Sequence, residues 1–168
     1  LGLSGRAITI STVGVPGTIA RLAAAQLPCT LAVSLHAPNQ LLREKLVPSA
    51  RAYPIDDLMA DCAAYFRSTG RRVTFEYTLM AAQNDSVEHA RELALLLRRH
   101  GMLPSTSPAG GPRGAGGPVP SSPSPASSHG GGAHVNLIPY NSVEGAGYAR
   151  PTRARVAEFR RALQEAAG

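Results

Sequence analysis

Short apolar runs alternate with segments of helical spacing along most of this chain, and no other feature of the sequence restricts the fold as strongly. Four runs rich in β-branched or aromatic residues have the length and composition of strands. They are Ala7–Thr12, Thr30–Leu35, Arg72–Met80 and His134–Tyr140. Such an alternation of strands and helices favours an α/β fold, with a parallel sheet or part of a (β/α) barrel.

The helix predictions rest on apolar spacing and on residues that begin or end helices. Helices are predicted over Thr18–Gln26 and from Asn39 to about Leu46. A third, longer helix begins at Pro54 and ends at Gly70. Its apolar face comprises Ile55, Leu58, Met59, Cys62 and Phe66, spaced as one side of a helix. Cys62 is therefore predicted to belong to the core rather than to a reactive site.

Two further helices are predicted in the second half of the chain. Asp85 and Glu88 form a D-x-x-E variant of the capping box. The core face of the helix that follows is predicted to contain Val87, Ala90, Leu93, Ala94 and Leu97. Pro151 opens the last helix, whose inward residues are predicted to be Val156, Phe159 and Leu163.

Residues 103–133 break this pattern, because they are dominated by Pro, Gly and Ser. Such a composition cannot bury enough apolar surface to become ordered, so we predict a disordered insert. The insert divides one α/β unit into residues 1–102, with three strands, and residues 134–168, with the last strand and helix.

Charge and cysteine content limit the classes of partner and compartment. The net charge is +6, from 17 Lys and Arg against 11 Asp and Glu. This permits a nucleic-acid partner, although an arginine bias can also reflect the base composition of the gene. Two cysteines without close spacing argue against a disulfide framework or a zinc site, and favour a reducing compartment. No apolar run approaches the roughly 20 residues of a membrane span.

Small polar residues stand where the predicted strands end, which is where ligands gather in βα folds. The strand ends carry Ser11 and Thr12, Ser34 to His36, Asn84, and Pro139 to Asn141. These groups could form one side of a binding site for a polar ligand. They include no pair of acidic residues, no charged nucleophile and no set of metal ligands. The alternative is structural: the serines cap helices, His36 satisfies a loop carbonyl, and Asn84 holds a turn.

Glu76 is a carboxylate in the middle of a predicted strand. We expect a structural ion pair with an arginine, and the alternative is a contact to substrate or cofactor.

Six segments resemble successive motifs of the radical-SAM ribosomal-RNA adenine methyltransferases of the RlmN/Cfr type, in the family's order. They are ITISTVGVPG, LAVSLHAPN, VPSARAYPIDDL, GRRVTFEYTLM, NDSVEHARELA and HVNLIPYNSVEGAGYARPTRARVAEFR. The resemblance covers nearly the whole chain apart from the insert, and it implies the C-terminal half of a partial radical-SAM (β/α) barrel, with parallel strands and outer helices.

The family uses S-adenosylmethionine twice, once to methylate a cysteine and once as the source of a radical formed at a [4Fe-4S] cluster. The methyl group then reaches an adenine of 23S-type ribosomal RNA, at C2 in RlmN members and at C8 in Cfr members. Carried over by motif, the residues that contact S-adenosylmethionine would be Ser11, Ser34, Leu35, His36 and Asn141. The resemblance also implies ribosomal RNA, and transfer RNA for some members, as substrate. A reductant such as flavodoxin or ferredoxin, a monomeric state and no membrane partner are implied as well.

The family's CxxxCxxC cluster motif, its Gly-Glu cofactor motif and its methyl-accepting cysteine have no counterpart in these residues. We therefore expect a fragment with no catalytic residue and no metal ligand of its own, inactive alone, from an RNA adenine-C2 methyltransferase. The expected location is the cytoplasm, or the chloroplast stroma for a plant or algal protein.

Two other functions stay open at this stage. One is a noncatalytic RNA-binding or ribosome-assembly protein derived from this family. Its phosphate contacts would come from Arg71, Arg72, Arg150, Arg153 and Arg155. The other is an unrelated β/α-barrel enzyme, which the fold pattern alone would permit.

Overall fold

Strands and helices alternate along the chain in the predicted order. The structure, a computed structural model, describes residues 8–104, 131–143, 145 and 147–168. Its elements are β1 (Thr9–Thr12), α1 (Thr18–Ala24), β2 (Thr30–Ser34), α2 (Gln40–Leu46), the 3-10 helix η2 (Pro48–Arg51), α3 (Ile55–Thr69), β3 (Val73–Leu79), α4 (Val87–Arg99), β4 (Ala133–Pro139) and α5 (Arg153–Ala167).

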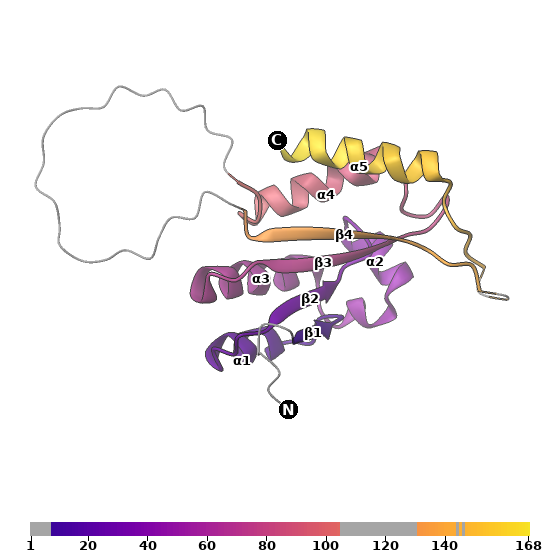
Figure 1. Ribbon diagram of the computed structural model, residues 1–168. Helices are drawn as coiled ribbons and strands as arrows, with labels where there is room; N and C mark the ends of the chain where they lie inside the picture. The colour runs from indigo at the N-terminus through magenta and orange to yellow at the C-terminus, as the bar shows by residue number, and fades with distance from the viewer. Residues whose placement is uncertain (1–7, 105–130, 144, 146) are drawn as a thin grey trace, which may run out of the picture.

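The strands form one sheet in the order β1-β2-β3-β4, and every neighbouring pair is parallel. All four strands therefore end at the same edge of the sheet (Figure 1). The register sets residues side by side across the strands: Ser11 pairs with Ala32, and Ser34 pairs with Glu76. Glu76 pairs in turn with Asn136 on β4. The predicted parallel α/β fold is confirmed.

The two faces of the sheet differ in their side chains. On one face, Val73, Phe75, Tyr77 and Leu79 of β3 are fully buried and belong to the core cluster with residues of α1, α3, α4 and α5. The ring centroids of Tyr77 and Phe159 lie 5.3 Å apart, which fixes α5 on this face. The other face carries Thr74, Glu76 and Thr78, which are only partly buried. On the neighbouring β4, the side chains of this open face are exposed: His134, Asn136 and Ile138.

The cores of two helices differ slightly from the prediction. On α3, Cys62 is fully buried as predicted, but Tyr65 is buried where Phe66 was expected. Phe66 is half-buried and lies against Gly132, where a Cβ atom would come within 2.5 Å of its ring. The strand that follows the insert therefore needs a glycine at its entry. On α4, Leu96 joins the core, while Val87 is only partly buried.

The predicted D-x-x-E capping box is wrong. The N-cap of α4 is Ser86, whose hydroxyl accepts a hydrogen bond from the amide of His89 at 3.2 Å. Asp85 is buried and accepts instead from the amide of Ala82, at 3.0 Å. Ala82 has a φ of 59°. Serine and aspartate are equally good caps, so the turn before the helix decided between them.

Residues 105–130 of the predicted insert lie outside the described residues. At its ends, Leu103 packs against the core and Ala133 is the first residue of β4. Among the residues that the structure describes, no helix is both long and apolar enough to cross a membrane.

Candidate functional site

The residues predicted to contact a cofactor lie at the carboxyl ends of three strands. Ser11 belongs to β1 and Ser34 to β2, which are neighbours, and His36 follows β2 directly. Asn141 follows β4, which β3 separates from β2. At about 4.8 Å per strand spacing, Ser11 and Asn141 are about 14 Å apart across the sheet. Only an elongated ligand could touch both.

Leu35 points away from the other four. Its side chain is fully buried in the core among the helices, and its amide donates to the carbonyl of Glu76 at 3.0 Å. Leu35 could therefore contact a ligand on the open face only through its backbone.

His36 is held in one orientation by the neighbouring strand. Its φ is 58°, in the left-handed region, so the chain turns sharply after β2. Its Nδ1 accepts a hydrogen bond from the amide of Thr78 at 3.0 Å. This contact requires the proton of the neutral ring to sit on Nε2. His36 therefore presents an N–H donor to a ligand. The structural alternative predicted a bond to a loop carbonyl, but the ring accepts from a backbone amide instead.

The pKa of His36 is lowered, first by burial, then by the charge of Arg43, with Glu76 opposing. We expect stability to fall as pH drops below about 6.5, because the unfolded chain takes up a proton that the folded ring resists. Urea unfolding at pH 7.5 and pH 5.5 measures this. His36→Gln should show a smaller loss over the same interval, and an equal loss in both proteins would contradict the assignment.

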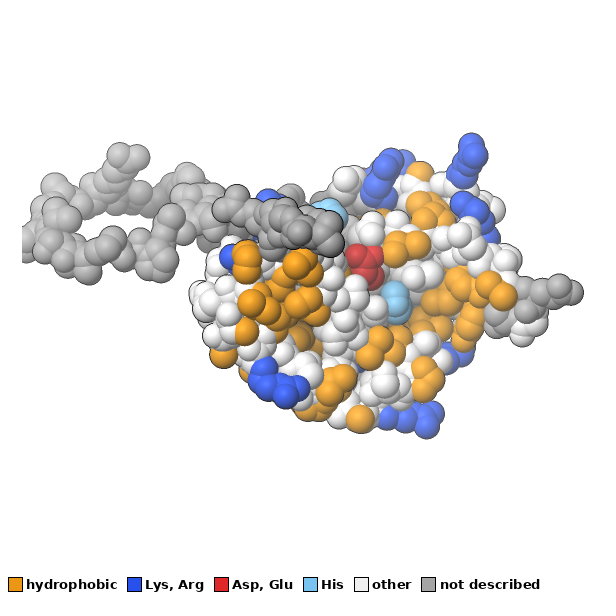
Figure 2. Space-filling view, turned by 60° about the horizontal axis from the view of Figure 1, so that its bottom comes forward, with side chains coloured by type: hydrophobic (Ala, Val, Ile, Leu, Met, Phe, Trp, Pro, Cys, Tyr) orange, Lys and Arg blue, Asp and Glu red, His pale blue; other side chains and the backbone are white. Residues whose placement is uncertain are grey.

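Glu76 occupies the middle of the open face. Its Oε2 accepts from the side-chain amide of Asn136 at 2.7 Å. Among the described residues it has no arginine partner, so the predicted ion pair is wrong. The reason is the register, which places Asn136 directly opposite it. Figure 2 shows an acidic side chain and histidine near the centre of one face, with Lys and Arg toward its margins.

Asn84 has a structural role at the turn after β3, next to His36. Its side chain is fully buried, and its Nδ2 donates to the carbonyls of His36 at 2.8 Å and Thr78 at 2.7 Å. Its Oδ1 accepts from the amide of Met80 at 2.7 Å. These three bonds satisfy the amide completely at the turn after β3, so the structural alternative is the correct one for Asn84.

Sequence reasoning missed Arg43 of α2, which is fully buried. Its Nη2 donates to the carbonyl of Val13 at 2.6 Å and lies 3.5 Å from that of Ser34, and its Nη1 lies 3.4 Å from that of Tyr53. Burial lowers the pKa of this guanidinium. Arg43 thus ties the ends of β1 and β2 together. No sequence signal separates such an arginine from a solvated one on the same helix.

Asn141 belongs to a loop that folds back on itself. Its Oδ1 accepts from Nη1 of Arg150 at 2.9 Å, and the amide of Arg150 donates to the hydroxyl of Ser142 at 3.3 Å. Tyr140 and Tyr148 pack edge to face, with ring centroids 6.1 Å apart. The loop therefore has internal contacts that orient the side-chain amide of Asn141.

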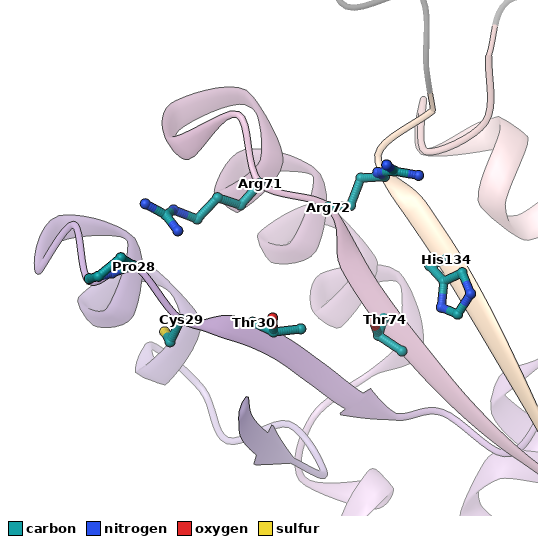
Figure 3. A pocket seen from close by; sticks show the side chains of 7 residues that line it. All are labelled: Pro28, Cys29, Thr30, Arg71, Arg72, Thr74 and His134. Atoms are coloured by element: carbon teal, nitrogen blue, oxygen red, sulfur yellow. The ribbon is translucent and has the colours of Figure 1, made fainter. Parts of the chain in front are cut away.

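A separate cavity of about 460 Å³ lies at the opposite, amino end of the strands. Figure 3 shows Arg71 extending toward the start of β2 and Arg72 toward the start of β4. The other residues that line this cavity are Pro28, Cys29, Thr30, Thr74 and His134. The arginines at this end are therefore remote from the carboxyl edge.

The described residues do not contain a metal centre. No group of three His, Cys, Asp or Glu among them is arranged to hold an ion. Cys29 and Cys62 are both buried, and burial raises the pKa of the Cys62 thiol to about 12. Cys62 is therefore an inert core thiol, as its helical position predicted.

Curated proteins and a solved structure are similar to this chain. No family model matches the chain. It is 48% identical over 164 residues to a protein of Thermosynechococcus vestitus and 48% identical over 163 residues to one of Gloeobacter violaceus, both named probable dual-specificity RNA methyltransferase RlmN. A crystal structure of a radical SAM methyltransferase from Sphaerobacter thermophilus superposes with a TM-score of 0.76 at 41% identity, covering 96% of this chain and 38% of that one.

The matches cover 98% and 97% of this chain but 40% and 38% of the two relatives. The chain thus spans about two fifths of the length of the curated relatives it matches, in their C-terminal part.

Proposed function

Since this chain belongs to the RlmN-type radical-SAM methyltransferases and matches the C-terminal part of its relatives, we propose that its carboxyl edge binds S-adenosylmethionine for the methylation of RNA. The observation that carries the proposal is the alignment of Ser11, Ser34, His36 and Asn141 along one edge of the parallel sheet. Members of the family use S-adenosylmethionine and a [4Fe-4S] cluster.

The residues at this edge suit S-adenosylmethionine by their chemistry. The ligand is elongated and carries an adenine, ribose hydroxyls and an amino-acid group. The hydroxyls of Ser11 and Ser34 and the Nε2–H of His36 are neutral hydrogen-bonding groups. Asn141 adds a side-chain amide beyond β4, where Arg150 orients it. S-adenosylmethionine supplies the transferable methyl group, and these side chains would hold and orient it.

The [4Fe-4S] cluster does not fit the residues of this chain. Such clusters are held by cysteine thiolates. The chain has two cysteines: Cys29 directly precedes β2, and Cys62 lies in the middle of α3. Burial keeps the Cys62 thiol protonated. No catalytic step is therefore assigned to a cysteine of these residues.

The finer specificity is part of the proposal. We expect the complete protein to methylate C2 of an adenine in 23S-type ribosomal RNA and in transfer RNA, through a methylcysteine outside these residues. The support is the dual-specificity RNA methyltransferase name shared by its relatives. Mass spectrometry of ribosomal and transfer RNA nucleosides, with and without the full gene, tests this. RNA without any gene-dependent methyladenine would favour a noncatalytic RNA-binding protein.

Replacing Asn141 tests the cofactor site directly. Asn141→Ala removes an exposed amide and should lower affinity for S-adenosylmethionine by about tenfold, the effect of losing one good hydrogen bond. Isothermal titration calorimetry on the complete protein measures it. Gln164→Ala removes an exposed amide from α5 and should leave the affinity unchanged. Equal affinities in all three proteins would exclude Asn141 from the site.

A further inference from the structure

A small cavity beside the carboxyl end of β4 has arginine as its only charged lining. Its volume is about 230 Å³, and it lies between Pro139 and the first turns of α5. Three arginines line it: Arg150, Arg153 and Arg160. The remaining lining residues are uncharged, namely Pro139, Pro151, Val156 and Ala157. A cavity with this lining favours an anionic ligand.

Helix geometry explains why two of these arginines share the cavity. Arg153 and Arg160 are seven residues apart, so they lie on the same face of α5, about 10 Å apart along its axis. Both are exposed, and neither forms a salt bridge with a carboxylate of the described residues. Their charges are therefore available to a ligand.

The structure separates Arg150 and Arg153 from the other arginines that the sequence suggested for phosphate contacts, which are Arg71, Arg72 and Arg155. Arg155 lies on the same helix, but its Nε is 3.7 Å from Asp85 and its Nη1 is 3.1 Å from Glu158. Its charge is thus largely compensated. Arg71 and Arg72 line the cavity at the amino end of the strands. Thr74, which lines that cavity, lies four residues before Thr78 on β3. Thr78 contacts His36. The cavity is therefore about 13 Å from the carboxyl edge of the sheet.

We infer that the cavity formed by Arg150, Arg153 and Arg160 binds phosphate groups of the RNA next to the base that is modified. This inference rests on the proposed function, and it adds the place where the RNA backbone is held. Arg150 donates to Asn141 at 2.9 Å, so the cavity adjoins the candidate cofactor site.

Position and chemistry both favour RNA phosphates as the ligand. A base brought to the carboxyl edge carries phosphates on both of its sides, so anions must lie close to this edge. Guanidinium groups bind phosphate oxygens in pairs, with a geometry that fits better than an ammonium group. Two arginines about 10 Å apart would engage different phosphates of one strand rather than a single one.

Two double variants with equal charge change test the inference. Arg153→Gln with Arg160→Gln removes two charges at the cavity and leaves Arg150 and Asn141 intact. Arg71→Gln with Arg72→Gln removes two charges at the other end of the strands. In the complete protein, fluorescence anisotropy measures binding of a labelled single-stranded RNA oligonucleotide over a series of salt concentrations, and calorimetry measures S-adenosylmethionine affinity.

We expect the first double variant to bind RNA about tenfold more weakly at 0.1 M salt. Its slope of log affinity against log salt should be shallower by about 1.4, because each single-strand phosphate contact contributes about 0.7. The second double variant should change RNA affinity less than about twofold, and both variants should keep the S-adenosylmethionine affinity of the parent chain.

Equal losses of RNA affinity in the two double variants would overturn the inference, because they would indicate diffuse attraction by net charge. A chain that binds S-adenosylmethionine but not RNA would also overturn it, while leaving the cofactor site standing. Inorganic phosphate that binds the parent chain, together with unchanged RNA affinity in the first double variant, would indicate a free-anion site instead. A complete protein that binds neither ligand would remove the proposed function as well.

Discussion

Arg43→Ala is expected to lower the free energy of unfolding by about 3 to 5 kcal/mol. The guanidinium is fully buried and donates to the carbonyl of Val13 at 2.6 Å, with the carbonyls of Ser34 and Tyr53 within 3.5 Å. Its removal takes the guanidinium donor from one buried contact, to Tyr53, and two partly buried ones, to Val13 and Ser34. Each buried group left without a partner costs about 1 to 3 kcal/mol. Urea unfolding followed by circular dichroism measures the effect.

The control for this prediction is an arginine that is mostly exposed. Arg99 has 63% of its side chain exposed, and it pairs with Asp56 at 2.6 Å on the surface. Arg99→Ala should therefore change the free energy of unfolding by about 1 kcal/mol or less. Arg43→Lys keeps a charge but loses the forked donors, so an intermediate loss is expected. A stable Arg43→Ala protein would show that the strand ends are held together by other contacts.

Asn84→Asp is expected to lower the free energy of unfolding by about 3 kcal/mol or more at pH 7. The substitution removes the two donors to the carbonyls of His36 and Thr78, and it places a carboxylate against both oxygens in a fully buried position. Burial and these oxygens disfavour the charged form, so the pKa of the new carboxyl should rise in the folded state. The loss should therefore be smaller at pH 4.5 than at pH 7.

The same substitution at an exposed asparagine provides the control. Asn141 is exposed, and its Oδ1 accepts from Arg150, which a carboxylate would also satisfy. Asn141→Asp should therefore change stability by less than about 0.5 kcal/mol at either pH. If Asn84→Asp unfolds at the urea concentration of the parent chain at pH 7, the buried amide is not what fixes the turn after β3.

Both predicted losses concern residues that hold the ligand edge without being assigned to the ligand. Arg43 joins the strand ends that carry Ser11 and Ser34, and Asn84 holds the carbonyl of His36. By contrast, Asn141→Ala should lower the affinity for the cofactor with little change in the free energy of unfolding. Stability and affinity measured together can therefore separate positioning residues from binding residues.

The order of strands and helices could be predicted from the sequence because its causes are local. The apolar alternation of Val73–Leu79 lies within β3. The helical spacing of Ile55, Leu58, Met59 and Cys62 lies within α3. Parallel pairing then follows from the strand-helix alternation. It places Ser11, Ser34, His36 and Asn141 at one edge without any knowledge of their contacts. The choice of Ser86 over Asp85 as a helix cap was not predictable in this way, since both residues cap well.

Only the tertiary structure decided the partners of the polar side chains. Asn84 bonds to a residue 48 positions away, Arg43 to one 30 positions away, and Glu76 to one 60 positions away. The placement of Arg71 and Arg72 in one cavity, of Arg153 and Arg160 in another, and of Arg155 in ion pairs was decided in the same way. Such contacts depend on how strands and helices pack, and a charge or an amide has the same appearance in the sequence whether it is solvated or buried. Hydrophobic periodicity reports the backbone's local geometry, whereas a hydrogen bond between distant residues is determined only when the packed elements bring its two atoms together.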